Sequence, residues 1–109
     1  MINPQTAFEK LAQFDTADEI AQYLQHLGIK GHRTSSTHCP ISQFMSERTG
    51  LVVSTGSAVR TFANVEYWKA LEHNFKAPVT DAMCDFIARF DRGRYPELID
   101  TTTERIAYA

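Results

Sequence analysis

Residues 39–63 change from a helical to a strand-like pattern within one short segment, which reads Cys39-Pro40-Ile41-Ser42-Gln43-Phe44-Met45-Ser46-Glu47-Arg48-Thr49-Gly50-Leu51-Val52-Val53-Ser54-Thr55-Gly56-Ser57-Ala58-Val59-Arg60-Thr61-Phe62-Ala63. Pro40 suits the first position of a helix, and apolar residues follow at helical spacing until Gly50. After Gly50, β-branched residues flank the turn signal Thr55-Gly56-Ser57, which predicts a hairpin. Because an isolated hairpin is marginally stable in water, we expect it to pack on helices or to gain a third strand.

Helices are also expected on both sides of this segment. The first follows Pro4, and the second begins at the capping box Thr16-Ala17-Asp18-Glu19 and ends at Gly28. Another helix is expected to begin at Thr80 and to end near Gly93.

Residues 64–76 are ambiguous, because their apolar positions fit a helical face and part of the segment also fits a strand. We predict a helix here, and we expect Pro78 to end whichever element forms.

The chain length of 109 residues is that of one domain, so we predict a single domain over 1–109 with frayed ends at 1–5 and 101–109. Hydrophobic residues make up 43% and charged residues 22%, as in ordinary globular proteins. The expected fold class is α+β, with three or four helices packed on a small antiparallel β-hairpin or three-stranded sheet.

Composition also excludes several classes of protein. The net charge of −2 argues against a nucleic-acid partner. The chain contains no apolar run long enough to cross a membrane, and residues 1–6 lack the pattern of a signal peptide. Two cysteines are too few for a disulfide scaffold, and we expect a cytoplasmic location without a membrane partner.

Charge is unevenly distributed, because residues 30–60 are locally basic within an acidic chain. The most polar part of this region is the loop 30–38, which leads into the helix that begins at Pro40. A loop of cations and hydroxyls before a helix start can bind a phosphate or a carboxylate. The candidate binding residues are therefore Lys30, His32, Arg33, Ser35, Ser36 and Thr37.

Cys39 is the candidate for thiol chemistry. It precedes an expected helix N-terminus, where partial positive charge stabilises a thiolate, and His38 is the adjacent candidate base. The competing interpretation is that Cys39 is a small buried side chain at the start of the helix. Cys84, between Met83 and Phe86, is expected in the core, and a Cys39–Cys84 disulfide is not expected in a reducing compartment.

No metal or cofactor site is predicted. The histidines and cysteines lack the close Cys-x-x-Cys or His-x-x-x-His spacing of common zinc sites, and no phosphate-loop or dinucleotide fingerprint is present.

Two short motifs of this chain are similar to motifs in a group of small uncharacterised bacterial proteins. One is the helix that begins Cys39-Pro40-Ile41 with Phe44, and the other is Phe90-Asp91-Arg92-Gly93-Arg94-Tyr95-Pro96-Glu97-Leu98. In those proteins a Cys-Pro-led helix is followed by a short sheet and a Phe-Asp-x-Gly-x-Tyr-Pro-x-Leu ending. The resemblance supports a small α+β fold over residues 16–99 and implies no activity, cofactor or site.

Three functional hypotheses follow from these patterns. The leading one is a non-enzymatic interaction module that binds a protein partner, or a second copy of itself, through the loop 30–38 and the adjacent helix start. The second is a thiol-dependent enzyme or redox sensor built on Cys39, and the third is a binder of a small anionic ligand.

Overall fold

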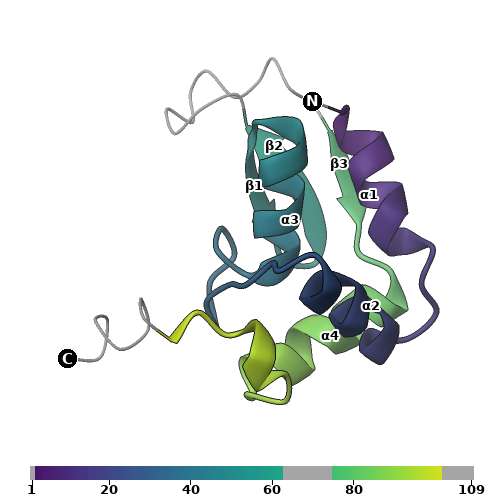
Figure 1. Cartoon of the computed structure of the whole chain (residues 1–109). Coiled ribbons are helices and arrows are strands. Elements are labelled where there is room, and N and C mark those ends of the chain that lie inside the picture. Colours follow the sequence, from purple (N-terminus) through teal and green to yellow (C-terminus); the bar gives the residue numbers. More distant parts are fainter. Residues whose placement is uncertain (1, 63–74, 102–109) are drawn as a thin grey trace.

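The computed structural model describes residues 2–62 and 75–101. In this part of the chain, four α-helices pack on a three-stranded antiparallel sheet, which confirms the predicted α+β fold (Figure 1). In chain order the elements are α1 (Pro4–Ala12), α2 (Ala17–His26), α3 (Pro40–Thr49), β1 (Val52–Thr55), β2 (Ala58–Phe62), β3 (Lys76–Pro78), α4 (Asp81–Asp91) and the short 3-10 helix η2 (Pro96–Leu98).

The predicted helix boundaries are confirmed by local hydrogen bonds. Thr16 Oγ1 accepts from the Glu19 amide at 3.2 Å, and the Glu19 carboxylate accepts from the Thr16 amide at 3.1 Å, so both arms of the capping box form. Gly50 ends α3 in the left-handed conformation with φ of 73°. Thr80 caps α4 by accepting from the Met83 amide at 3.1 Å.

The sheet has the order β1-β2-β3, and both strand pairs are antiparallel. Its inner face is formed by alternating residues that are all buried, namely Val53, Thr55, Val59 and Thr61. Helix α3 packs against β1 on this side, and α1 runs beside β3, where the Phe8 and Phe75 rings lie 5.8 Å apart (Figure 1).

The prediction of a helix over residues 64–76 is wrong at its C-terminal end, because Lys76 lies in a strand. Residues 63–74 lie outside the described residues, but Lys76 begins β3, where it pairs with Arg60 of β2. The free edge of β2 offers hydrogen-bond partners that the helical pattern of the sequence does not reveal. Pro78 is the last residue of β3, and an edge strand tolerates proline because its amide side faces away from the sheet.

The core lies between the sheet and the helices and is rich in aromatic side chains. Helices α2 and α4 pack together below the sheet in Figure 1. The Phe86 ring stacks on Phe90 and Tyr95, with ring centroids 6.0 and 5.3 Å away. The largest fully buried side chains are Phe44, Phe86, Phe90, Leu11, Ile20, Leu24, Ile41, Met45, Met83, Leu98, Val53 and Val59.

The described part of the N-terminus is attached to the rest of the fold. The Ile2 amide donates to the Arg48 carbonyl at 2.9 Å, and Asn3 caps α1 by accepting from the Thr6 amide. These bonds connect the first described residues to α3 and to the first turn of α1, and the fraying of residues 1–5 stays a prediction. Residues 102–109, most of the other predicted frayed end, lie outside the described residues.

Helix length bears on the membrane prediction. The longest helix among the described residues, α4, has 11 residues, whereas a membrane-spanning helix needs about 20. No helix in residues 2–62 or 75–101 is long and apolar enough to cross a bilayer.

Candidate functional site

The loop 30–38 folds back on itself and is anchored at both ends. Gly31 forms a parallel bridge with Ile99: its amide donates to the Leu98 carbonyl at 2.8 Å, and its carbonyl accepts from the Asp100 amide at 2.9 Å. At the other end the His32 amide donates to the His38 carbonyl at 2.8 Å. The loop is therefore a closed structure and not a loose connection.

The two histidines of the loop lie face to face. The His32 and His38 rings stack with centroids 5.4 Å apart and planes 14° from parallel. His38 Nδ1 is within hydrogen-bonding distance of Thr37 Oγ1 at 2.9 Å, and His32 Nε2 lies 3.8 Å from Asp100 Oδ2. His38 therefore contacts another residue of the loop, and His32 contacts the C-terminal segment at Asp100.

A buried hydroxyl network ties the loop to α3 and β1. Ser42, which is fully buried, donates to the Ser36 carbonyl at 2.6 Å and lies 2.7 Å from Thr55 Oγ1. Since Ser42 has one hydroxyl proton, Thr55 is the donor in the second bond. The Thr55 amide also donates to the Ser36 carbonyl at 2.8 Å, so Ser36 is held from two sides.

Replacing Ser42 by alanine is expected to lower the free energy of unfolding by about 2 kcal/mol, because the buried Thr55 hydroxyl loses its acceptor. Urea denaturation followed by circular dichroism measures the change. Ser54→Ala on the outward face of β1 is the control, with an expected change below about 0.5 kcal/mol. Equal effects of the two substitutions would contradict a structural role for the network.

The tip of the loop is strained. Thr34 has φ of 56°, in the left-handed region that β-branched residues rarely adopt. Among the described residues other than glycine, Thr34 alone has a positive φ. Its amide donates to Asp91 Oδ1 of α4 at 2.8 Å, across 57 residues of sequence. A contact made by tertiary structure thus holds Thr34 in this conformation.

Beside this tip lies a hollow of about 250 Å³, which we call the loop hollow. Its walls come from the loop, the start of α3, the β1–β2 turn and α4. The lining residues are Thr34, Ser35, Ser36, Cys39, Thr55, Gly56, Ile87 and Asp91. The structure therefore brings two of the predicted binding residues, Ser35 and Ser36, together with Cys39.

The four remaining predicted binding residues do not line the loop hollow. Lys30 is exposed, and Arg33 is half-buried near Gly93. Thr37 contacts His38, and His32 stacks on His38. The first residues of α3 are buried. The backbone amides at the N-terminus of this helix, which the anion-binding hypothesis needs as donors, therefore lie below the surface.

The two cysteines have opposite environments, and both are free thiols. Cys39 is 4% exposed, and its Sγ lies 3.6 Å from Ser42 Oγ, which suits a buried side chain at the start of a helix. The prediction that Cys84 lies in the core is wrong, because Cys84 is exposed. Buried residues Met83 and Phe86 face the core, and Cys84 is turned about 100° from Met83 around the helix axis, toward solvent.

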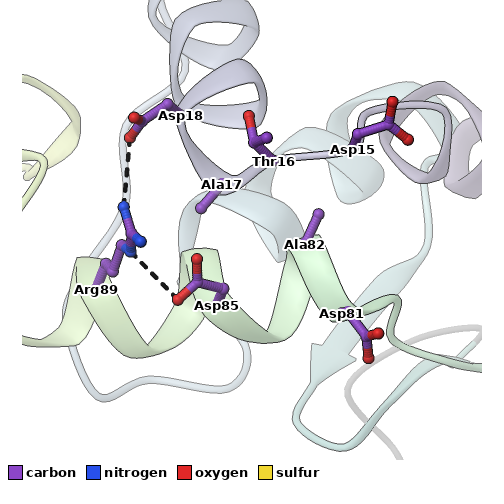
Figure 2. A pocket seen from close by; sticks show the side chains of 8 residues that line it. All are labelled: Asp15, Thr16, Ala17, Asp18, Asp81, Ala82, Asp85 and Arg89. Carbon is purple, nitrogen blue, oxygen red and sulfur yellow. Dashed lines mark hydrogen bonds and ion pairs between the residues drawn. The ribbon is translucent and has the colours of Figure 1, made fainter.

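A second depression, which sequence reasoning missed, lies between the start of α2 and α4. Figure 2 shows this acidic cleft, a cavity of about 430 Å³ lined by Asp15, Thr16, Ala17, Asp18, Asp81, Ala82, Asp85 and Arg89. Two patterns in the sequence indicate acidic surfaces, namely the excess acidic charge of residues 1–29 and the four-residue spacing of Asp81 and Asp85. The sequence does not reveal that these surfaces form one cleft, because that depends on the packing of α2 on α4.

Arg89 partly neutralises the acidic cleft. It lies 3.2 Å from Asp85 and 3.7 Å from Asp18, and Figure 2 shows it between these two carboxylates. Hydrogen bonding with Tyr95 and the charge of Asp85 raise the pKa of Arg89 above its usual range. Burial and the hydrogen bond that Tyr95 donates to Asp18 at 2.8 Å raise the pKa of Tyr95.

Among residues 2–62 and 75–101, the structure contains no group of three or more His, Cys, Asp or Glu side chains arranged to hold a metal ion.

Comparison with known proteins assigns no family to this chain. A scan against protein-family models finds no match, and searches of curated proteins and of solved structures find none either.

Proposed function

We propose that this chain is a non-enzymatic interaction module and that a protein partner docks at the loop hollow. The observation that carries the proposal is the strained tip of the loop, held at φ of 56° by the Thr34–Asp91 hydrogen bond on the rim of the hollow. Strained residues of this kind cost about 1–3 kcal/mol and cluster at functional sites.

The construction of the loop hollow supports the same proposal. Ser36 is anchored to Ser42 and Thr55, and Gly31 is anchored to the C-terminal segment, so the walls are held before any partner arrives. Preorganised walls lower the entropic cost of binding. We also keep the prediction of a cytoplasmic location, where both thiols stay reduced.

Two observations favour this function over the thiol hypothesis. Cys39 is almost fully buried, whereas a nucleophilic thiol needs access to its substrate. The His38 ring contacts Thr37 and stacks on His32, which occupies the side chain proposed as the base.

The β3 edge of the sheet bears on self-association through strand pairing. Val59 and Ala77 pair between β2 and β3, which turns the backbone groups of Lys76 and Pro78 toward the open edge. Pro78 has no amide proton, and a lysine beside it is a common way to discourage edge pairing. A partner, including a second copy, is therefore expected at the loop hollow and not on β3.

Selection of peptides from a random displayed library on the immobilised full chain tests the proposal. Ser36→Tyr, which places a ring at the exposed rim of the hollow, is expected to weaken the selected peptides at least ten-fold. Gln5→Tyr on the exposed face of α1 is the matched control and should leave their affinity within two-fold. Equal affinity for both variants would reject the loop hollow as the docking site.

A further inference from the structure

The loop hollow carries a single charged group among its lining residues, the carboxylate of Asp91. One oxygen, Oδ1, accepts from the Thr34 amide. The ion pairs that the structure records among its described residues involve Asp18, Asp85 and Asp100, and Asp91 takes part in none of them. Among the described residues, no hydrogen bond or ion pair is recorded for the second oxygen of Asp91, a residue that lines the loop hollow.

The position of Asp91 also favours a positively charged ligand. Asp91 is the last residue of α4, where the partial negative charge of the helix end destabilises a carboxylate. The side chain is half-buried, so water screens this repulsion less than at an exposed site. Arg92 and Arg94, which follow in the chain, are exposed and are not among the residues lining the loop hollow.

The other walls define what kind of cation fits. Ile87 lies one turn before Asp91 on α4, and together with Cys39 it forms an apolar wall. Hydroxyl-bearing Ser35, Ser36 and Thr55 lie on the remaining sides. An aliphatic stem that ends in a charged nitrogen matches this arrangement, because such a group buries its methylene chain and presents its charge to a polar end.

Geometry favours an ammonium over a guanidinium. A guanidinium binds a carboxylate best through two parallel hydrogen bonds, one to each oxygen, so Asp91 Oδ1 would have to accept from the guanidinium and from the Thr34 amide together. An ammonium is a compact charge with three donors that need not lie in one plane. The volume of about 250 Å³ is below the roughly 300–1,000 Å³ of sites for drug-sized ligands, which suits one side chain.

We propose that the loop hollow binds an alkylammonium group, with its aliphatic stem against Ile87 and its nitrogen on Asp91. The inference rests on the proposed function and specifies the chemistry of the partner, because the group is a lysine side chain of the docked protein. The free amine n-butylammonium serves only as a comparison in the test. The sequence predicts a basic binding surface on the loop 30–38, whereas the charged residue that lines the loop hollow is acidic. The difference arises because Asp91 belongs to α4 and not to the loop.

The test is a nuclear magnetic resonance titration of the ¹⁵N-labelled full chain with three probes. They are the peptide acetyl-Gly-Gly-Lys-Gly-Gly-amide, the same peptide with its lysine Nε acetylated, and n-butylammonium chloride. The lysine peptide is expected to shift the amides of Ser36, Gly56 and Asp91 and to bind at least ten-fold more tightly than its acetylated form. Equal binding of the two peptides, or shifts confined to the acidic cleft, would overturn the proposal.

Asp91→Asn keeps an oxygen for the Thr34 amide and removes the charge, so the loop should stay folded while the lysine peptide binds at least ten-fold more weakly. Asp85→Asn, on the same helix and outside the loop hollow, is the matched control and should change binding less than two-fold. Unchanged binding to Asp91→Asn would also overturn the proposal.

The probes also separate the two proposals. Binding of n-butylammonium as tight as that of the lysine peptide would overturn the assignment of a partner's lysine, and weaker binding supports it. If Ser36→Tyr abolishes binding of library peptides whose affinity depends on neither lysine nor Asp91, the docking site stands and the alkylammonium assignment fails.

Discussion

Replacing Gly31 by alanine is expected to lower the free energy of unfolding by about 3 kcal/mol. A Cβ at this position would lie 2.5 Å from the His38 carbonyl oxygen, 2.6 Å from the Pro40 nitrogen and 2.7 Å from the Cys39 carbonyl carbon. All three are backbone atoms and cannot rotate away, so the loop would separate from the start of α3. Urea denaturation measures the loss.

Gly56→Ala is the matched control for this substitution. A Cβ on Gly56 meets nothing within 4 Å, so the expected change in unfolding free energy is below about 0.5 kcal/mol. If Gly31→Ala were as stable as Gly56→Ala, the close approach of Gly31 to the segment 38–40 would be wrong. The loop hollow, which depends on this approach, would then lose its support.

Under native conditions Cys84 is expected to react with a maleimide at least about a hundred-fold faster than Cys39. Cys84 is exposed on α4, whereas Cys39 is 4% exposed and reacts only when the loop or the whole domain opens. A rate ratio of one hundred corresponds to an opening free energy of about 2.7 kcal/mol. Mass spectrometry of peptides from the alkylated chain measures both rates.

The thiol hypothesis predicts the opposite order, because a reactive Cys39 would be alkylated first. Cys84→Ser serves as the control: it should leave one slowly reacting thiol, which becomes fast in urea. Fast alkylation of Cys39 in the native chain would revive the thiol hypothesis and weaken the case for an interaction module.

Burial and charge in the site were only partly predictable from the sequence. The loop 30–38 is recognisable from its polar composition. It lies next to Cys39 because Cys39 directly follows it in the chain. The carboxylate that defines the chemistry of the loop hollow belongs to Asp91, 57 residues beyond Thr34. The acidic cleft is similarly assembled from the start of α2 and the exposed face of α4 (Figure 2).

Helix starts and ends were accessible from the sequence because their signals act over a few residues. Thr16 and Glu19 cap α2 within one turn, and Gly50 ends α3 through its own backbone conformation. No distant contact is needed for either effect. The hairpin β1–β2 is equally local, since its strands are joined by a short turn.

Only the tertiary structure settles features that depend on which elements meet. Lys76 belongs to a strand because Arg60 offers a free sheet edge, and Cys84 is exposed because α4 turns Met83 and Phe86 toward the core. Thr34 adopts a left-handed conformation because Asp91 accepts its amide hydrogen bond. In each case the free energy comes from a partner far along the chain, which no local pattern encodes.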